Sequence, residues 1–215
     1  MMSGSWLISF LFFMGGLFII GATTKRSILK KSKNKASEQY WAREHAATFS
    51  RKKEIPTDNF ITVDFSVYPI VEDVECQQLY DKLMLFKERP LINLKGFSNV
   101  ELKERYGTMQ LEKLSYYEQN FIEYMNTSCA YGKLLLKKGH LLESQKVLEY
   151  ILSIGCDLSQ AYLTLIEIYT TTQMDRDDTL RHLKNLREFA CTNMQSSPYL
   201  KKVILGIDNA IDCLI

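Results

Sequence analysis

Residues 125–158 read MNTSCAYGKLLLKKGHLLESQKVLEYILSIGCDL, and they lie in the most informative region of the sequence. Apolar residues recur every three or four positions on both sides of a KKGH turn, which predicts two amphipathic helices joined by a short connection. The first helix should begin near Ser115 and continue to about Lys138. The second should begin near Leu141 and end before Gly155. The stretch therefore predicts an antiparallel helical hairpin.

The same periodicity continues toward the C-terminus. A third helix is expected after Asp157, and a fourth after the acidic pair Asp177-Asp178. Ser197 offers an N-cap and Pro198 a first-turn position for a final helix over residues 199–214. The pattern downstream of the hairpin is therefore one of paired helices with short turns.

Upstream of the hairpin the signals are more varied. Residues 72–87 have helical periodicity, and Ser98 with Glu101 has the spacing of a capping box that starts a short helix ending at about Tyr106. Gly107 is suited to the left-handed conformation that follows a helix. Residues 60–68 (FITVDFSVY) alternate apolar and polar side chains, which predicts a short extended strand lying as an arm along the helices.

The hairpin resembles the tetratricopeptide repeat (TPR), a 34-residue helical hairpin. With Met125 at position 1, the repeat's characteristic small, apolar and turn positions are occupied by Gly132, Gly139, Ser144, Leu148, Ile151 and Cys156, and in the next period by Tyr162, Leu165 and Tyr169. The resemblance covers residues 125–158 and 159–192, the second with about one inserted residue. Ser128, Ser144 and Cys156 depart from the motif, so a hairpin stack that is only TPR-like remains the alternative.

A hairpin of this kind cannot bury its apolar face alone and needs stacked neighbours. The expected fold class is therefore all-α: about seven helices in a TPR-like antiparallel hairpin stack with one short extended segment. An N-terminal transmembrane helix is expected to precede this stack.

The expectation of a transmembrane helix comes from residues 1–24, which carry no charged side chain. Trp6 to Gly21 reads WLISFLFFMGGLFIIG, and a helix from Trp6 to Thr24 spans roughly the 30 Å hydrocarbon core of a bilayer. A cleaved secretory signal would need a basic region before the apolar run, whereas the basic residues follow it. An uncleaved anchor is favoured.

The net charge of +2 conceals an uneven distribution. Residues 25–55 carry ten Lys or Arg against three Glu, while residues 56–215 are net acidic. Because positive flanks stay in the cytoplasm, we expect a single-pass plasma-membrane protein with its N-terminus outside and its C-terminal domain cytoplasmic. The basic flank is also the candidate contact with anionic lipid. It consists of Lys25, Arg26, Lys30, Lys31, Lys33 and Lys35.

These patterns divide the chain into a transmembrane anchor (1–24), a basic juxtamembrane linker (25–55) and a cytoplasmic TPR-like helical domain (56–215). Within the linker, residues 36–50 are a candidate interfacial helix with Tyr40, Trp41, Ala47 and Phe49 partly on one side. The whole layout resembles small membrane-anchored TPR-like proteins of Gram-positive bacteria. That resemblance covers the anchor, RKKEIPTDNFITVDF (51–65), GFSNVELKERYG (96–107) and the hairpins.

The sequence gives little support for catalysis. Its five cysteines are odd in number and form no CxxC pair, which is typical of free thiols in a reducing compartment. The three histidines are scattered, no metal-binding or phosphate-binding motif is present, and Asp175 to Asp178 are better explained as helix-capping residues than as a calcium loop. We therefore expect no catalytic, cofactor-binding or metal site.

The function expected from these features is a membrane-tethered protein-protein interaction scaffold or adaptor, with an unidentified protein or peptide partner and no nucleic acid. The candidate partner groove lies along the first helix of each hairpin and comprises Asn126, Cys129, Lys133, Lys137, Leu163, Glu167 and Thr170. The alternatives are a non-catalytic accessory subunit of a membrane enzyme or other assembly, and an enzyme in which His140 or His182 meets buried carboxylates.

Overall fold

Helical periodicity dominates the folded chain. A computed structural model describes residues 35–172 and 175–214, and the fold class over these residues is all-α, with no strand. Residues 35–48 are helical. The further helices are α2 (Val74–Met84), α3 (Asn99–Tyr106), α4 (Leu111–Lys137), α5 (Leu141–Ser153), α6 (Ser159–Thr171), α7 (Arg176–Asn193) and α8 (Leu200–Asp212).

The chain divides into two units. Unit 1 comprises residues up to Glu54 together with Phe97–Leu111, and unit 2 comprises Ile55–Gly96 and Glu112–Ile215. The segment that contains α3 thus groups with the basic linker, although the sequence placed all of residues 56–215 in one helical domain. The described residues contain no helix long and apolar enough to cross a membrane, and the expected anchor at 6–24 lies outside them.

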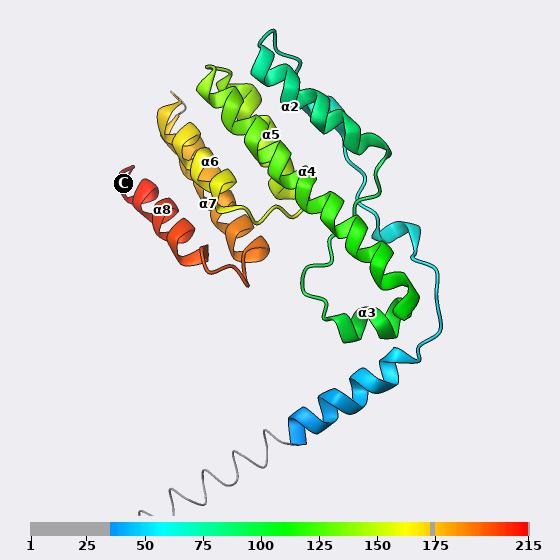
Figure 1. Ribbon diagram of the computed structural model, residues 1–215. Helices are drawn as coiled ribbons and strands as arrows, with labels where there is room; N and C mark the ends of the chain where they lie inside the picture. Colours follow the sequence, from blue (N-terminus) through cyan, green and yellow to red (C-terminus); the bar gives the residue numbers. More distant parts are fainter. Residues whose placement is uncertain (1–34, 173–174, 215) are drawn as a thin grey trace, which may run out of the picture. The chain divides into compact units, whose positions relative to one another are not determined.

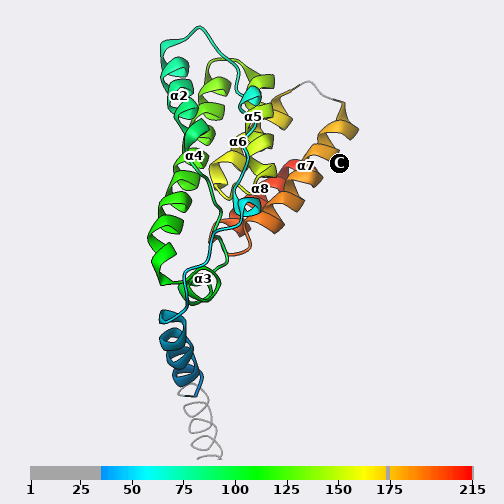
Figure 2. The ribbon, with the colours of Figure 1, turned by 90° about the vertical axis from the view of Figure 1, so that its right-hand side faces the viewer.

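Unit 2 is a row of helices that follow one another in space in chain order. The hairpin of α4 and α5 is followed by α6 with α7, and α8 packs against both members of that second pair (Figures 1 and 2). Residues from all of these helices share one buried apolar cluster, which includes Tyr131, Leu148, Leu165, Leu183 and Val203. Each helix therefore covers the apolar face of its neighbour, as the amphipathic patterns require.

Close packing within the first hairpin depends on small residues. Gly132 on α4 has no side chain, and a Cβ placed there would lie 2.7 Å from Cδ2 of Leu148 on α5. The buried Ser144 Oγ donates a hydrogen bond to the Gly132 carbonyl oxygen at 2.7 Å. Absence of a side chain at residue 132 thus allows the two helices to approach closely.

The segment predicted as a strand is an extended arm interrupted by a turn. Its alternation is present, since Ile61, Val63, Phe65 and Val67 pack against the core while the residues between them are exposed. The strand prediction itself was wrong, because the Asp64 carboxylate accepts hydrogen bonds from the Ser66 backbone N–H and hydroxyl and bends the chain into a 3-10 turn, η2 (Phe65–Val67).

A buried tyrosine cluster holds the arm. The Tyr68 hydroxyl at the end of the arm lies 2.5 Å from the Tyr124 hydroxyl and 2.9 Å from the Ser128 hydroxyl of α4. Tyr131 of α4 donates to the Pro69 carbonyl oxygen at 2.5 Å. Burying these phenols without hydrogen bonds would be unfavourable, so their mutual pairing specifies where the arm lies.

Several predicted helix ends are confirmed and others shift. The Ser98–Glu101 capping box is present, and Asp175 caps α7 by accepting from the Asp177 N–H. The C-terminal helix begins at Leu200 rather than at residue 199, with Tyr199 instead of Ser197 as its N-cap residue. Gly107 has the expected positive φ of 82°, and a Cβ there would lie 2.6 Å from the Arg51 carbonyl oxygen within unit 1.

Candidate functional site

The predicted groove residues lie on α4 and α6, and most of them face solvent. Asn126, Lys133 and Lys137 on α4 are exposed, as are Glu167 and Thr170 on α6. The i, i+4 spacing of the two lysines places their ammonium groups on the same side of α4. These five side chains are accessible to a partner.

The other two predicted groove residues are less accessible. Cys129 is only 4% exposed, and burial raises the pKa of its thiol to about 11. Leu163 is half-buried on the side of α6 that faces Gly206 of α8. Cys129 is therefore inaccessible to a partner, although it lies one turn before the exposed Lys133 on the same side of α4.

The lysines at the end of α4 differ in their partners. Lys138 lies 2.6 Å from an oxygen of Asp73 and 3.0 Å from one of Glu75 at the start of α2. Hydrogen bonding by this ammonium group holds the pKa of the Asp73 carboxyl below its usual value. Neither Lys133 nor Lys137 has a carboxylate partner among residues 35–172 and 175–214. Their charges are therefore available to an external anion.

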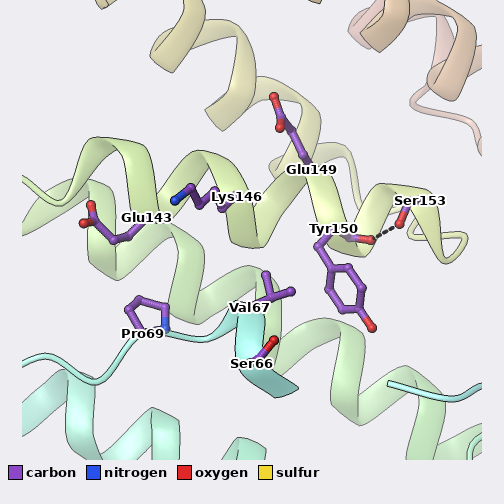
Figure 3. A pocket seen from close by; sticks show the side chains of 8 residues that line it. All are labelled: Ser66, Val67, Pro69, Glu143, Lys146, Glu149, Tyr150 and Ser153. Carbon is purple, nitrogen blue, oxygen red and sulfur yellow. Dashed lines mark hydrogen bonds between the residues drawn. The ribbon is translucent and has the colours of Figure 1, made fainter. Parts of the chain in front are cut away.

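An open groove of about 630 Å³ lies between the arm and α5. Figure 3 shows Ser66, Val67 and Pro69 of the arm on one side, with Tyr150 of α5 pointing toward them. The Asp64 N–H of the arm donates to the Tyr150 hydroxyl oxygen at 2.6 Å. Tyr150 thus helps to hold the arm, and its ring forms part of the groove wall.

A second, smaller cavity of about 240 Å³ contains a cluster of polar side chains contributed by three helices. Oε1 of Glu149 on α5 accepts a hydrogen bond from the Tyr169 hydroxyl of α6 at 2.7 Å and one from Gln145 Nε2 at 2.8 Å. His182 Nδ1 of α7 lies 3.5 Å from the same oxygen. Burial and the nearby carboxylate raise the pKa of Tyr169.

This cluster matches only part of what an enzyme would need. His182 does meet a carboxylate, but Glu149 is partly exposed, and the cavity lining contains no serine, cysteine or lysine that would act as a nucleophile. His140 precedes α5 and makes no side-chain cap. The sequence did not single out Glu149, because its partners lie 20 and 33 residues away and only the stacking of α5, α6 and α7 brings them together.

Metal ligands do not converge in the described parts of the chain, where no group of three or more His, Cys, Asp or Glu side chains is placed to hold an ion. Of the candidate lipid-contacting flank, Lys35 is described and exposed, whereas Lys25, Arg26, Lys30, Lys31 and Lys33 lie outside the described residues.

Comparison with known protein families, curated proteins and solved structures gives no significant match.

Proposed function

We propose that this chain is a membrane-tethered protein-interaction scaffold in which TPR-like hairpins of unit 2 offer an exposed surface of α4 and α6 to a protein or peptide partner. The observation that carries the proposal is the pair Lys133 and Lys137, which are exposed at i, i+4 spacing and unpaired within the described residues. Two unpaired cations on one helix face suit an acidic partner segment.

The TPR-like character is supported by packing at the positions that the motif specifies. Gly132 and Ser144 lie at the close approach of α4 and α5, and Leu148 fills the space that the glycine leaves. In the next hairpin Tyr162 is fully buried and donates its hydroxyl to the Cys156 carbonyl oxygen at 3.0 Å. Repeats of this kind generally bind partners along the first helices of successive hairpins.

The tether in this proposal is the uncharged stretch Trp6–Thr24, followed by the basic flank. A short N-terminus outside the plasma membrane and a cytoplasmic helical domain follow from the positive-inside rule. Such a tether would confine the α4 and α6 surface to a thin layer next to the membrane. Confinement of this kind raises the effective concentration of a partner that is itself membrane-bound.

The experiment is affinity purification of the full chain from native membranes after crosslinking. The variant Lys133→Glu/Lys137→Glu should reduce recovery of an acidic partner by at least about tenfold, since opposed like charges cost several kcal/mol at an interface. Lys201→Glu/Lys202→Glu on α8 makes the same change in net charge at exposed lysines elsewhere and should keep the partner. Equal recovery of the partner with the α4 variant and the α8 variant would contradict binding at Lys133 and Lys137.

The alternative of an accessory subunit with a ligand pocket is favoured by one observation, the cavity that contains Glu149, Tyr169 and His182. His182→Gln keeps a polar side chain of similar size and removes the titratable ring. A change in the activity of a co-purifying enzyme, with partner recovery unaltered, would support this alternative. We propose no catalytic role for the chain itself.

A further inference from the structure

The helix at residues 35–48 carries an exposed aromatic stripe. Trp41, His45 and the following Phe49 recur every four residues and so lie on one side of the helix. Trp41 is 64% exposed and Phe49 is 74% exposed. The rings of His45 and Phe49 contact each other with centroids 5.1 Å apart, and the Tyr40 ring lies 5.6 Å from that of Trp41. Side chains of this size seldom remain in water in such an arrangement.

The opposite side of this helix is occupied by contacts inside unit 1. Arg43 pairs with Glu104 of α3 through two hydrogen bonds of 2.7 and 2.5 Å, and Glu44 pairs with Lys103 of the same helix. Ala47 is buried on this side. These contacts fix the rotation of the helix about its axis. Because Trp41, His45 and Phe49 lie on the other side of the helix, the aromatic stripe faces away from α3.

Basic residues lie on both sides of the stripe along the chain. Lys35 precedes it, and Arg51, Lys52 and Lys53 follow it, all exposed. Aromatic rings combined with flanking Lys and Arg are typical of helices that lie in the headgroup region of anionic bilayers, where rings enter the interface and cations meet lipid phosphates. The charge and side-chain types therefore match a lipid surface better than an acidic peptide, which would not require three large rings.

The reach of the chain agrees with this assignment. Eleven peptide units separate Thr24, the end of the uncharged stretch, from Lys35, so the start of the helix lies no more than about 40 Å from the end of the membrane segment. Under the proposed tether, the stripe is thus held within reach of the cytoplasmic leaflet.

We propose that the Trp41–His45–Phe49 stripe lies in the interface of the anionic leaflet, so that unit 1 is seated on the membrane surface. This inference rests on the proposed tether and deepens it by naming a second, non-spanning contact. Its consequence is that unit 1 presents α3 on the side of the helix opposite to the lipid. The anchor alone would leave unit 1 free to leave the surface.

The test uses the full chain in proteoliposomes of phosphatidylcholine with phosphatidylserine. The chain has two tryptophans, so Trp6→Phe leaves Trp41 as the only one. Lipids brominated near the carbonyl end or near the methyl end of the acyl chain quench tryptophan according to its depth. Trp41 emission should be quenched more by the shallow bromines than by the deep ones, and should lie at a shorter wavelength than that of a water-exposed tryptophan.

Two variants complete the test. Phe49→Glu should weaken the quenching, whereas Gln39→Glu adds the same charge at an exposed position off the stripe and should not; circular dichroism checks that both variants fold. Emission of Trp41 that is insensitive to bromine at both depths, whether at a long or a short wavelength, would overturn the inference. Carbonate extraction of the same proteoliposomes tests the tether separately, because release of the chain contradicts the anchor whatever Trp41 shows.

Discussion

The hydroxyl of Ser144 on α5 donates a hydrogen bond to the backbone carbonyl of Gly132 on α4, at 2.7 Å and in the fully buried core. The two residues are 12 positions apart and lie on the two helices of one hairpin. Their contact is possible because Gly132 has no Cβ to separate the helices, and Leu148 packs directly over the glycine. The geometry of the first hairpin therefore depends on a small residue at position 132.

Replacing Gly132 with alanine should destabilise unit 2. The new Cβ would lie 2.7 Å from Leu148 Cδ2, and overpacking of this kind costs about 1–3 kcal/mol, partly offset by the roughly 1 kcal/mol that alanine gains over glycine in a helix. We expect a net loss of about 1 kcal/mol, and at most about 2 kcal/mol, in the free energy of unfolding, measured by urea denaturation of the purified chain in detergent.

Gly206→Ala is the matched control, because its Cβ would lie at an ordinary 3.4 Å from Ile166 Cδ1. This variant should be neutral or slightly stabilising. Equal effects of the two substitutions would show that α4 and α5 do not pack as closely as described.

The tyrosine cluster leads to a prediction about the arm. Tyr68→Phe removes the hydroxyl that pairs with Tyr124 and Ser128 and leaves two buried polar groups short of a partner, at a cost of about 1–3 kcal/mol. Hydrogen exchange should accelerate at the Ile61 amide, which bonds to the Leu91 carbonyl oxygen at 2.9 Å. Tyr116→Phe alters an exposed ring and should change neither the free energy of unfolding nor the exchange rate of the Ile61 amide. A similar response to Tyr68→Phe and Tyr116→Phe would contradict the proposed role of the cluster.

Burial of the cysteines predicts their reactivity. Cys191 and Cys213 are exposed, whereas Cys76, Cys129 and Cys156 are buried, and burial raises the pKa of the Cys156 thiol to about 12. With a thiol reagent near pH 8, two groups should react quickly and three only after unfolding, because the thiolate is the reactive species. A Cys191→Ser/Cys213→Ser variant should lose the fast phase completely. A third rapidly reacting thiol in the native chain would show that Cys76, Cys129 or Cys156 is accessible to solvent, which contradicts their burial.

The buried phenols predict a loss of stability at high pH. Burial raises the pKa of Tyr68 and of Tyr131 to about 12, above the value of about 10 in an unfolded chain. Because the folded-state pKa is the higher one, their contribution is complete below about pH 10 and is lost as the pH rises toward 12. For Tyr68 this amounts to about 2–3 kcal/mol.

Absorbance of tyrosinate measured together with circular dichroism checks this prediction. The buried Tyr68 and Tyr131 should ionise only as helicity is lost. Ionisation of all tyrosines in one step near pH 10, with helicity intact, would mean that the cluster is accessible to water.

Local patterns predicted much of the fold. Periodicity located α5 within a residue or two because Val147, Leu148 and Ile151 repeat on one face and are all fully buried. The Ser98 capping box was predictable because both partners are three residues apart. In contrast, the bend at Asp64 depends on a side-chain to backbone bond that overrides a strand-like alternation.

Local sequence patterns could not predict contacts between residues that are far apart in the sequence. The grouping of α3 with the N-terminal helix depends on the Arg43–Glu104 and Glu44–Lys103 pairs, about 60 residues apart, and no periodicity encodes which charges meet. The Glu149, Tyr169 and His182 cluster likewise arises from the stacking of three helices. At the candidate groove, Lys133 is exposed whereas Cys129, one turn earlier on the same side of α4, is buried, so the helical period alone does not determine which of these residues a partner can reach.

We propose that exposed residues of α4 and α6 bind a partner at the membrane. Site-specific photocrosslinking of the full chain in native membranes tests it most directly, with the photoreactive residue placed at Asn126 or Glu167 on this face, or at the exposed Tyr199 as reference. We predict one common adduct from residues 126 and 167, absent from residue 199 and lost in the Lys133→Glu/Lys137→Glu background. No adduct from this face, or the same adduct from all three positions, would contradict it.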